Sequence, residues 1–173
     1  MRQHDAVEVI TAKRERGALS DSQIDWVIDA YTRGEVADEQ MSALAMAILL
    51  NGMTRHEIAR WTDAMIRSGD RMDFSGLSRP TSDKHSTGGV GDKVTLVVEP
   101  LVASCGVPVG KMSGRGLSFS GGTIDKLESI PGFRTTLTTA EFKQQLREIG
   151  VVLTGQAANL APADGKLYSL RDV

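Results

Sequence analysis

The sequence predicts an all-α N-terminal domain followed by an α/β domain with a mostly parallel sheet. Regular helical punctuation over residues 1–69 supports the first part, and alternation of short extended and helical segments over 83–161 supports the second. Hydrophobic residues make up 40% of the 173 residues and aromatic residues only 5%, so we expect aliphatic cores.

The N-terminal part should consist of helices with recognisable caps. Ser20 and Thr54 each stand three residues before a glutamine or glutamate, the spacing of a capping box. We expect four helices, over about 5–16, 21–33, 38–51 and 54–68. A glycine that tolerates positive φ should follow each helical run, at Gly17, Gly34, Gly52 and Gly69.

Two stretches of this part have a distinctive composition. The helix over 38–51 is apolar nearly all round and should be the most buried. Its core-packing positions follow the helical spacing at Met41, Leu44, Ala45 and Ile48. The basic cluster at 13–16, at the end of the first helix, is typical of a solvated face.

The remainder of the chain changes character after a polar segment. Residues 70–82 contain glycine and proline and should form a linker and hinge. We then expect an extended piece near 80–86, helices near 92–105, 122–129 and 139–149, and strands over 107–109 and 151–153. A further helix starts at Pro162. With three strands at most, the sheet is small, so we expect an N-terminal part of a longer protein.

Composition also bears on partners and location. The net charge of −2 and scattered basic residues argue against nucleic-acid binding. No apolar stretch reaches the ~18 residues of a membrane span, the N-terminus does not resemble a signal peptide, and we expect a cytoplasmic protein. The three histidines lack metal-ligand spacing, so we expect no metal site. The lone Cys105 should be a small buried side chain in a reducing compartment.

Two glycine-rich loops carry the chemistry. The first, KHSTGGVGDK over 84–93, combines glycines that allow close backbone approach with a following helix start, which favours an anion. Lys84, Ser86 and Thr95 add a cation and two hydroxyl groups. The loop fits neither a Walker A motif nor a dinucleotide fingerprint, and a glycine-rich turn without a ligand is the simpler alternative.

The second loop lies within 111–128 and also runs from a strand to a helix. Lys111, Ser113 and Thr123 can face the same anion as the first loop, because loops at the carboxyl ends of adjacent parallel strands converge on one crevice. Two such loops in one chain make a chance occurrence much less credible. We therefore expect one phosphate site shared by both loops.

The combination KHSTGGVGD (84–92), SGRGL (113–117) and GGTIDKLE (121–128) resembles thymidine and pyrimidine-nucleoside phosphorylases. The likeness continues through SIPGF (129–133) and through 159–173. It implies a helical domain and an α/β domain with the site in the cleft between them, a segment from about 162 returning to the helical domain, and homodimers formed through the helical domain. It also implies a chain more than twice this length.

The resemblance assigns roles to particular residues. Lys84, Ser86, Thr95, Ser113 and Thr123 match the phosphate ligands of the family, and Lys111 matches one of the pyrimidine-nucleoside branch. His85 and Arg171 match residues that contact the base, and would act there as the catalytic donors. No cofactor is implied, because phosphate is the co-substrate.

Two positions depart from the family pattern. Phe119 replaces a polar ring beside the site, which bears on substrate preference. Lys93 stands where some relatives carry a hydroxyl group for a monovalent cation, so we expect no potassium requirement.

Two other functions are alternatives. An anthranilate-type phosphoribosyltransferase shares the fold but differs in both loops. The second alternative is an isolated chain that binds phosphate without turnover, because only half of the base site lies within it.

Overall fold

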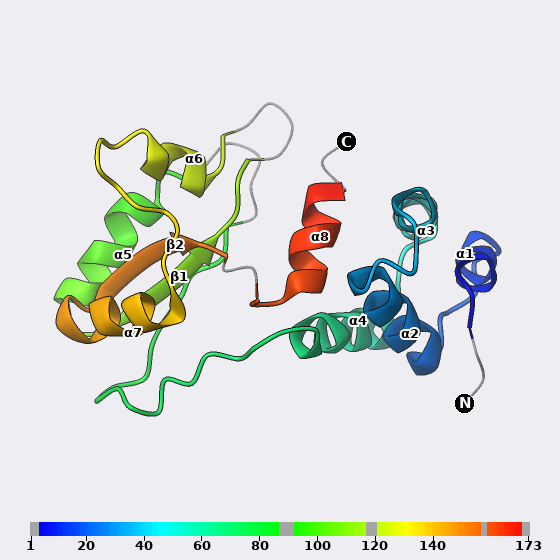
Figure 1. Ribbon diagram of the computed structural model, residues 1–173, viewed down its shortest axis with the longest axis horizontal. Helices are drawn as coiled ribbons and strands as arrows, with labels where there is room; N and C mark the ends of the chain where they lie inside the picture. The colour runs from blue at the N-terminus through cyan, green and yellow to red at the C-terminus, as the bar shows by residue number, and fades with distance from the viewer. Residues whose placement is uncertain (1–3, 87–91, 117–120, 157–158, 171–173) are drawn as a thin grey trace. The chain divides into compact units, whose positions relative to one another are not determined.

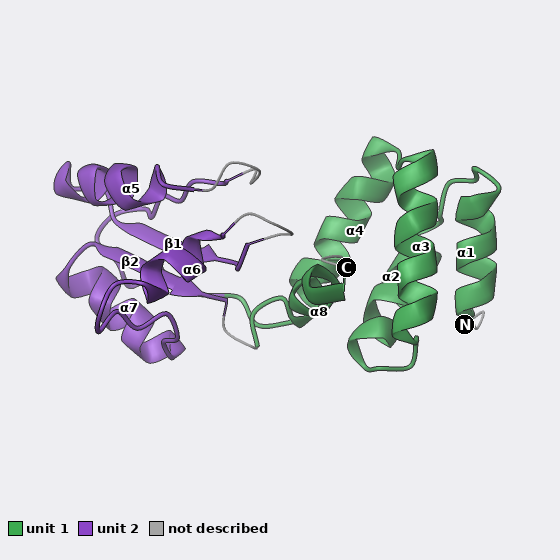
Figure 2. Ribbon diagram, turned by 90° about the horizontal axis from the view of Figure 1, so that it is seen from above, with its two compact units in different colours: residues 1–71, 158–173 green, residues 72–157 purple. Residues whose placement is uncertain are grey.

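The computed structural model describes residues 4–86, 92–116, 121–156 and 159–170 (Figure 1). The chain forms two compact units, coloured separately in Figure 2. The first comprises Met1–Arg71 with Ala158–Val173, and the second comprises Met72–Ala157. Each unit has its own hydrophobic cluster.

The first unit is helical, as the sequence predicted. Its helices are α1 (Ala6–Arg14), α2 (Asp21–Thr32), α3 (Asp38–Asn51), α4 (Arg55–Arg67) and α8 (Pro162–Leu170). The capping boxes at Ser20 and Thr54 are both formed. Helix α8 packs against α2 and α4, where Lys166 Nζ donates to the Tyr31 carbonyl oxygen at 2.7 Å and lies 4.1 Å from the centre of its ring.

The core of this unit centres on α2, and the expectation that α3 would be the most buried helix is wrong. Helix α2 buries Ile24, Val27, Ile28, Ala30 and Tyr31. Helix α3 packs closely along α1 and buries Met41 and Leu44, but Met46, Leu49 and Leu50 are 54%, 76% and 74% exposed. A helix that is apolar all round still buries only the faces that its neighbours cover.

The basic cluster at the end of α1 is solvated at residues 14–16, as expected, but not at Lys13. Lys13 is only 3% exposed, and its Nζ donates to Glu57 Oε1 at 2.7 Å. The same carboxylate accepts hydrogen bonds from the backbone N–H groups of Leu19 and Thr54. Burial alone raises the pKa of Glu57, but these donors outweigh burial and lower it to about 2.

The left-handed residue at the end of α1 is Arg16, with φ 65°, where we expected Gly17. Gly34 and Gly52 do adopt positive φ, at 77° and 71°. No helix of the described residues is long and apolar enough to cross a membrane.

The second unit contains a two-stranded parallel sheet, which confirms the predicted α/β character. Its elements are α5 (Thr95–Ser104), β1 (Val109–Ser113), α6 (Thr123–Glu128), α7 (Thr139–Glu148) and β2 (Val151–Gly155). Val109 pairs with Val151 and Ser113 with Gly155, and Ser82 adds an isolated parallel bridge to Val109. Helices α5 and α7 lie on opposite sides of the strands (Figure 2).

Strand β1 begins later and extends further than predicted. Pro108 has no N–H to donate to a ladder, so regular pairing starts at Val109 and continues to Ser113. Side chains alternate along the strand, and a Cβ added at Gly110 would lie 3.1 Å from Phe142 Cζ on α7. Lys111 therefore points to the opposite side, toward α5.

The segment expected to be a linker is packed for part of its length. Met72, Phe74 and Leu77 lie against the cluster of Phe142, Leu146 and Val152. Cys105, by contrast, is exposed and not buried as predicted, because it is the C-cap of α5 and lies in the exposed turn over 105–107 between this helix and β1.

Candidate functional site

A buried carboxylate, Asp92, lies at the centre of the candidate site. Its Oδ1 accepts hydrogen bonds from Lys84 Nζ and, at 3.2 Å, from the Thr95 backbone N–H. Its Oδ2 accepts from the Thr95 hydroxyl and, at 2.9 Å, from the Thr123 hydroxyl. Lys84 begins the first loop, while Thr95 and Thr123 are the first residues of α5 and α6. Asp92 therefore joins residues from both glycine-rich loops.

The electrostatics of Asp92 show that its surroundings favour an anion. Asp92 is 7% exposed, and burial alone raises the pKa of its carboxyl group. The hydrogen bonds from Lys84, Thr95 and Thr123 outweigh burial and hold that pKa well below its usual range. An ammonium group, two hydroxyl groups and the start of α5 thus converge on one negative charge. The same donors suit a phosphate oxygen.

Lys111 extends the positive side of the site from β1. Its Nζ donates to the Lys84 carbonyl oxygen at 2.5 Å and lies 3.5 Å from Asp83 Oδ1. It also lies 4.0 Å from Glu99 Oε1 on α5. Lys111 is 4% exposed, so the structure holds this ammonium group among acceptors on the α5 side of the sheet.

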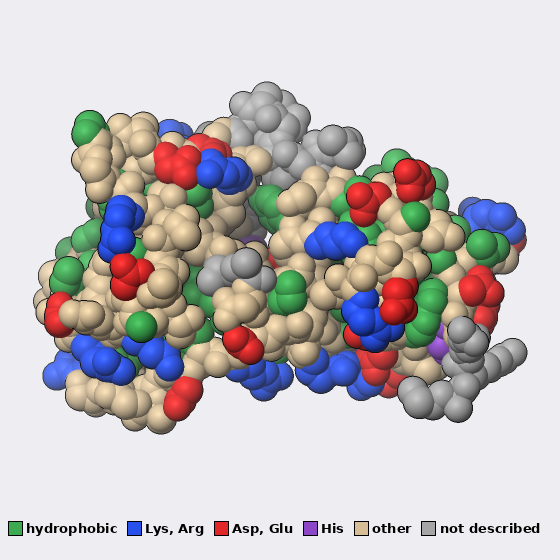
Figure 3. All heavy atoms as spheres, in the orientation of Figure 1, with side chains coloured by type: hydrophobic (Ala, Val, Ile, Leu, Met, Phe, Trp, Pro, Cys, Tyr) green, Lys and Arg blue, Asp and Glu red, His purple; other side chains and the backbone are tan. Residues whose placement is uncertain are grey.

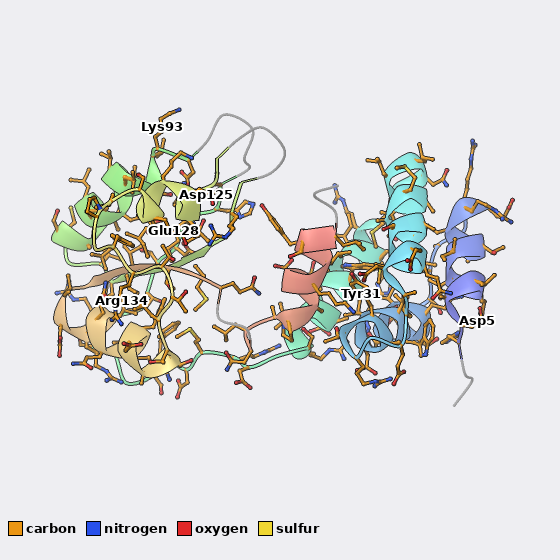
Figure 4. The ribbon with its side chains drawn as sticks, turned by 45° about the horizontal axis from the view of Figure 1, so that its top comes forward. Asp5, Tyr31, Lys93, Asp125, Glu128 and Arg134 are labelled. Atoms are coloured by element: carbon orange, nitrogen blue, oxygen red, sulfur yellow. The ribbon has the colours of Figure 1, made fainter. Side chains whose placement is uncertain are left out.

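The second loop is closed by Asp125, labelled on α6 in Figure 4. Its Oδ2 accepts hydrogen bonds from the N–H groups of Gly116 and Gly122, each at 2.8 Å, and these lower the pKa of Asp125. A Cβ at Gly122 would lie 2.3 Å from the Gly116 nitrogen, so the two ends of the loop approach too closely for another residue type. Arg115 pairs with Asp125 and Glu128 on the same side. The loop ends are thereby fixed next to Thr123.

Four of the six predicted phosphate ligands lie together in the structure. Lys84, Thr95 and Thr123 meet at Asp92, and Lys111 reaches the backbone of Lys84. Ser113 is the last residue of β1, at the carboxyl end of the strand, where the second loop begins.

The other predicted residues follow Lys84 or lie elsewhere. Ser86 is half-buried and His85 is exposed. Arg171 and Phe119 lie outside the described residues. Among the described residues, no group of three His, Cys, Asp or Glu side chains is placed to hold a metal ion.

Two residues that the sequence analysis did not assign to the site are Asp92 and Glu99. Asp92 was noticed only as part of the motif, although a carboxylate three residues before a helical threonine is a capping signal. Glu99 was not noticed, although it is the one charged residue in the apolar run of α5. A single charged residue within an apolar helix is a sequence signal that could have identified Glu99.

Comparisons with known protein families identify both parts of the chain. Two models of a glycosyl transferase family match, the helical bundle domain over residues 7–69 and the a/b domain over 78–173. The chain belongs to this glycosyl transferase family. The two-part fold predicted from the sequence is therefore confirmed.

Relatives within the family carry informative names. The chain is 59% identical over 169 residues to a thymidine phosphorylase of Mycobacterium tuberculosis (strain ATCC 25618 / H37Rv), covering 98% of this chain and 39% of that protein. It is 54% identical over 167 residues to a pyrimidine-nucleoside phosphorylase of Geobacillus stearothermophilus, covering 96% and 39%. The predicted resemblance is confirmed, and the chain spans 39% of the length of these relatives.

A solved structure shares the fold at lower identity. It is anthranilate phosphoribosyltransferase from Thermus thermophilus, with a TM-score of 0.72 and 24% identity, covering 94% of this chain and 49% of that chain. At this identity the likeness shows the fold alone.

Proposed function

We propose that this chain carries the phosphate-binding part of an enzyme that splits pyrimidine nucleosides with phosphate, in nucleoside salvage. The substrates would be thymidine and also uridine or deoxyuridine, and the products free base and the 1-phosphate of ribose or deoxyribose. The observation that carries the proposal is the convergence of Lys84, Thr95 and Thr123 on the buried Asp92. The names of the relatives at 54–59% identity support the reaction.

The chemistry follows from where negative charge develops. Phosphate attacks the anomeric carbon while the glycosidic bond breaks, and electrons move onto the carbonyl groups of the base. Cationic donors at the base stabilise that charge more in the transition state than in the bound substrate. We assign this role to His85 and Arg171. Phosphate would be held by Lys84, Ser86, Thr95, Lys111, Ser113 and Thr123.

Phosphate binding requires the donors around Asp92 to change partners. The hydroxyl groups of Thr95 and Thr123 donate to Asp92 in the structure, so a phosphate oxygen would compete with Asp92 for these donors. Phosphate would take over some of these hydrogen bonds, while Asp92 would keep the backbone N–H of Thr95 and hold α5 in place.

We also propose a homodimer formed through the first unit, in the cytoplasm. Met46, Leu49 and Leu50 form the exposed apolar face of α3. Residues 46, 49 and 50 are neighbours on one side of a helix, and such a face suits a second copy of the same chain. On the face of the molecule in Figure 3, basic and acidic side chains are interspersed, which does not favour nucleic acid as a partner.

One assay tests the proposed reaction. The chain is incubated with thymidine or uridine, with and without phosphate, and free base is measured. Release that requires phosphate supports the proposal, and the preferred nucleoside identifies the branch. Phosphate binding without release supports the non-catalytic alternative, whereas neither binding nor release contradicts both. Base release from thymidine that is independent of phosphate would contradict phosphorolysis.

A substitution at Lys84 tests the phosphate site itself. Lys84→Ala removes one charged hydrogen bond, which contributes about 1.5–3 kcal/mol, so the phosphate concentration needed should rise roughly 10- to 150-fold. Lys143→Ala is the matched control, because Lys143 lies on α7, across the sheet from α5. An unchanged phosphate requirement in Lys84→Ala would remove Lys84 from its assigned role.

A further inference from the structure

The carboxyl group of Glu99 is buried in the second unit without a hydrogen bond. Glu99 is 2% exposed, and neither of its oxygens has a hydrogen-bond partner among the described residues. Burying a carboxylate costs free energy, because the group loses its hydrating water and no hydrogen-bond donor takes the place of that water. Such a group calls for an explanation in terms of its neighbours.

The charged neighbours of Glu99 all belong to the candidate phosphate site. Lys111 Nζ lies 4.0 Å from Glu99 Oε1, the distance of a weak ion pair. Asp83, Lys84 and Asp92 also act on the carboxyl group electrostatically. The rest of α5, with the sequence TLVVEPLVAS, and β2, with VVLTG, contribute no other titratable side chain. Among the described residues, the charged groups that act most strongly on Glu99 are therefore those at this site.

Burial places the pKa of Glu99 near neutrality. Burial raises the pKa of Glu99 to about 7, and the Lys111 ammonium opposes that rise. Bound phosphate would add negative charge nearby and would compete with Glu99 for Lys111. Both effects favour the protonated carboxyl group.

We propose that Glu99 takes up a proton when phosphate occupies the site, and that it is a positioning residue that releases Lys111 to the phosphate. This inference rests on the proposed phosphate site. The proton goes to a Glu99 oxygen, and Lys111 stays an ammonium group throughout. Where dihydrogen phosphate enters, the net change is H₂PO₄⁻ plus the Glu99 carboxylate giving HPO₄²⁻ plus the neutral acid. The dianion, which is the better nucleophile, is then the bound form.

Calorimetry with a proton-inert anion tests the proposal. Sulfate has the shape and charge of HPO₄²⁻ but exchanges no proton near pH 7. Any proton taken up when sulfate binds is therefore bound by the protein. The chain is titrated with sulfate, and separately with phosphate, at pH 7 in buffers of different ionisation enthalpy. A group that titrates near 7 is half ionised at pH 7, so we expect an uptake of about half a proton per sulfate.

Two variants assign the proton. Glu99→Gln mimics the neutral acid and should bind sulfate without proton uptake. His85→Gln is the control for the exposed histidine of the site and should keep the uptake. If Glu99→Gln does not fold, the pH dependence of sulfate binding by the wild type and by His85→Gln tests the proposal instead. The affinity of both proteins for sulfate should weaken above pH 7, by up to about tenfold per pH unit.

The outcomes separate this inference from the proposed function. Binding of phosphate and sulfate with Glu99-dependent proton uptake supports both. Binding with no uptake, with the same uptake in Glu99→Gln, or with uptake lost in His85→Gln overturns the role of Glu99 and leaves the phosphate site standing. Absence of binding by both anions overturns the site and the inference together.

Discussion

Replacing Asp92 with asparagine tests whether one carboxylate organises the site. Asp92 accepts four hydrogen bonds, from Lys84, from Thr123 and twice from Thr95. A hydrogen bond to a charged group contributes about 1.5–3 kcal/mol, against about 0.5–1.5 for a neutral pair. Asparagine keeps one acceptor oxygen and is neutral. We therefore expect Asp92→Asn to lower the free energy of unfolding of the second unit by about 2–4 kcal/mol at pH 7.

The pH dependence gives this prediction a second check. The folded-state pKa of Asp92 lies below its ordinary value of 3.8, so its stabilisation is complete above that pH and is lost as the pH falls toward the folded pKa. One proton per molecule changes stability by about 1.4 kcal/mol per pH unit. The difference between wild type and Asp92→Asn should therefore be constant near pH 7 and about 1 kcal/mol smaller at pH 3.

The assay must report on the second unit. Both tryptophans, Trp26 and Trp61, lie in the first unit, so their fluorescence does not serve. Hydrogen exchange measured by mass spectrometry localises the loss of protection to α5, α6 and β1, and circular dichroism follows unfolding. Asp83→Asn is the control, because the Asp83 side chain is 54% exposed and its removal should cost less than about 1 kcal/mol. Equal stability of Asp92→Asn and wild type at pH 7, or a difference unchanged down to pH 3, would refute the reasoning.

Three further predictions concern stability, assembly and ions. Glu57→Gln should destabilise the first unit by about 3–5 kcal/mol in denaturant unfolding, because Lys13 stays buried without its partner. In the wild type this contribution is present above pH 4.5 and is lost as the pH falls toward about 2, and an unfolding curve insensitive to pH there would contradict it. Leu49→Asp should give monomers in sedimentation velocity. Ile130→Asp, a matching change at an exposed position of the second unit, should leave the dimer intact. Dimers of both variants would contradict the α3 interface. Base release should be equal in sodium and potassium phosphate if Lys93, which is exposed in Figure 4, replaces the monovalent cation, and strong activation by potassium would disprove that role.

The fold could be predicted largely from local signals. Each of the capping boxes at Ser20 and Thr54 involves only four consecutive residues, and both are formed. The burial of individual side chains was less predictable, because it depends on which helices pack against them. Lys13 is buried only because Glu57, distant in the sequence, meets it, and Leu49 is exposed only because α1 covers another side of α3.

The candidate site shows the same division. Glycines, lysines and hydroxyl residues were recognisable as anion ligands from their order in the two loops. The convergence of the two loops was also expected, but the carboxylate that joins them was not, since Asp92 accepts from Thr123, 31 residues further along the chain. The strand was also placed too early. The consequence is that Lys111, expected in a loop, lies within β1 and faces α5 and Glu99.

A site for an anion that is held together by carboxylates needs a physical reason. Asp92 and Asp125 each take hydrogen bonds from the groups that border the loops, and so keep Thr95, Thr123 and the glycine backbone in place before phosphate binds. Their negative charge also opposes phosphate, so binding must be an exchange of hydrogen-bond partners rather than a simple addition. Glu99 fits this logic, because protonation removes one negative charge as another arrives. A site built in this way should bind phosphate with an affinity that depends on pH through its carboxyl groups, in addition to the ionisation of phosphate itself.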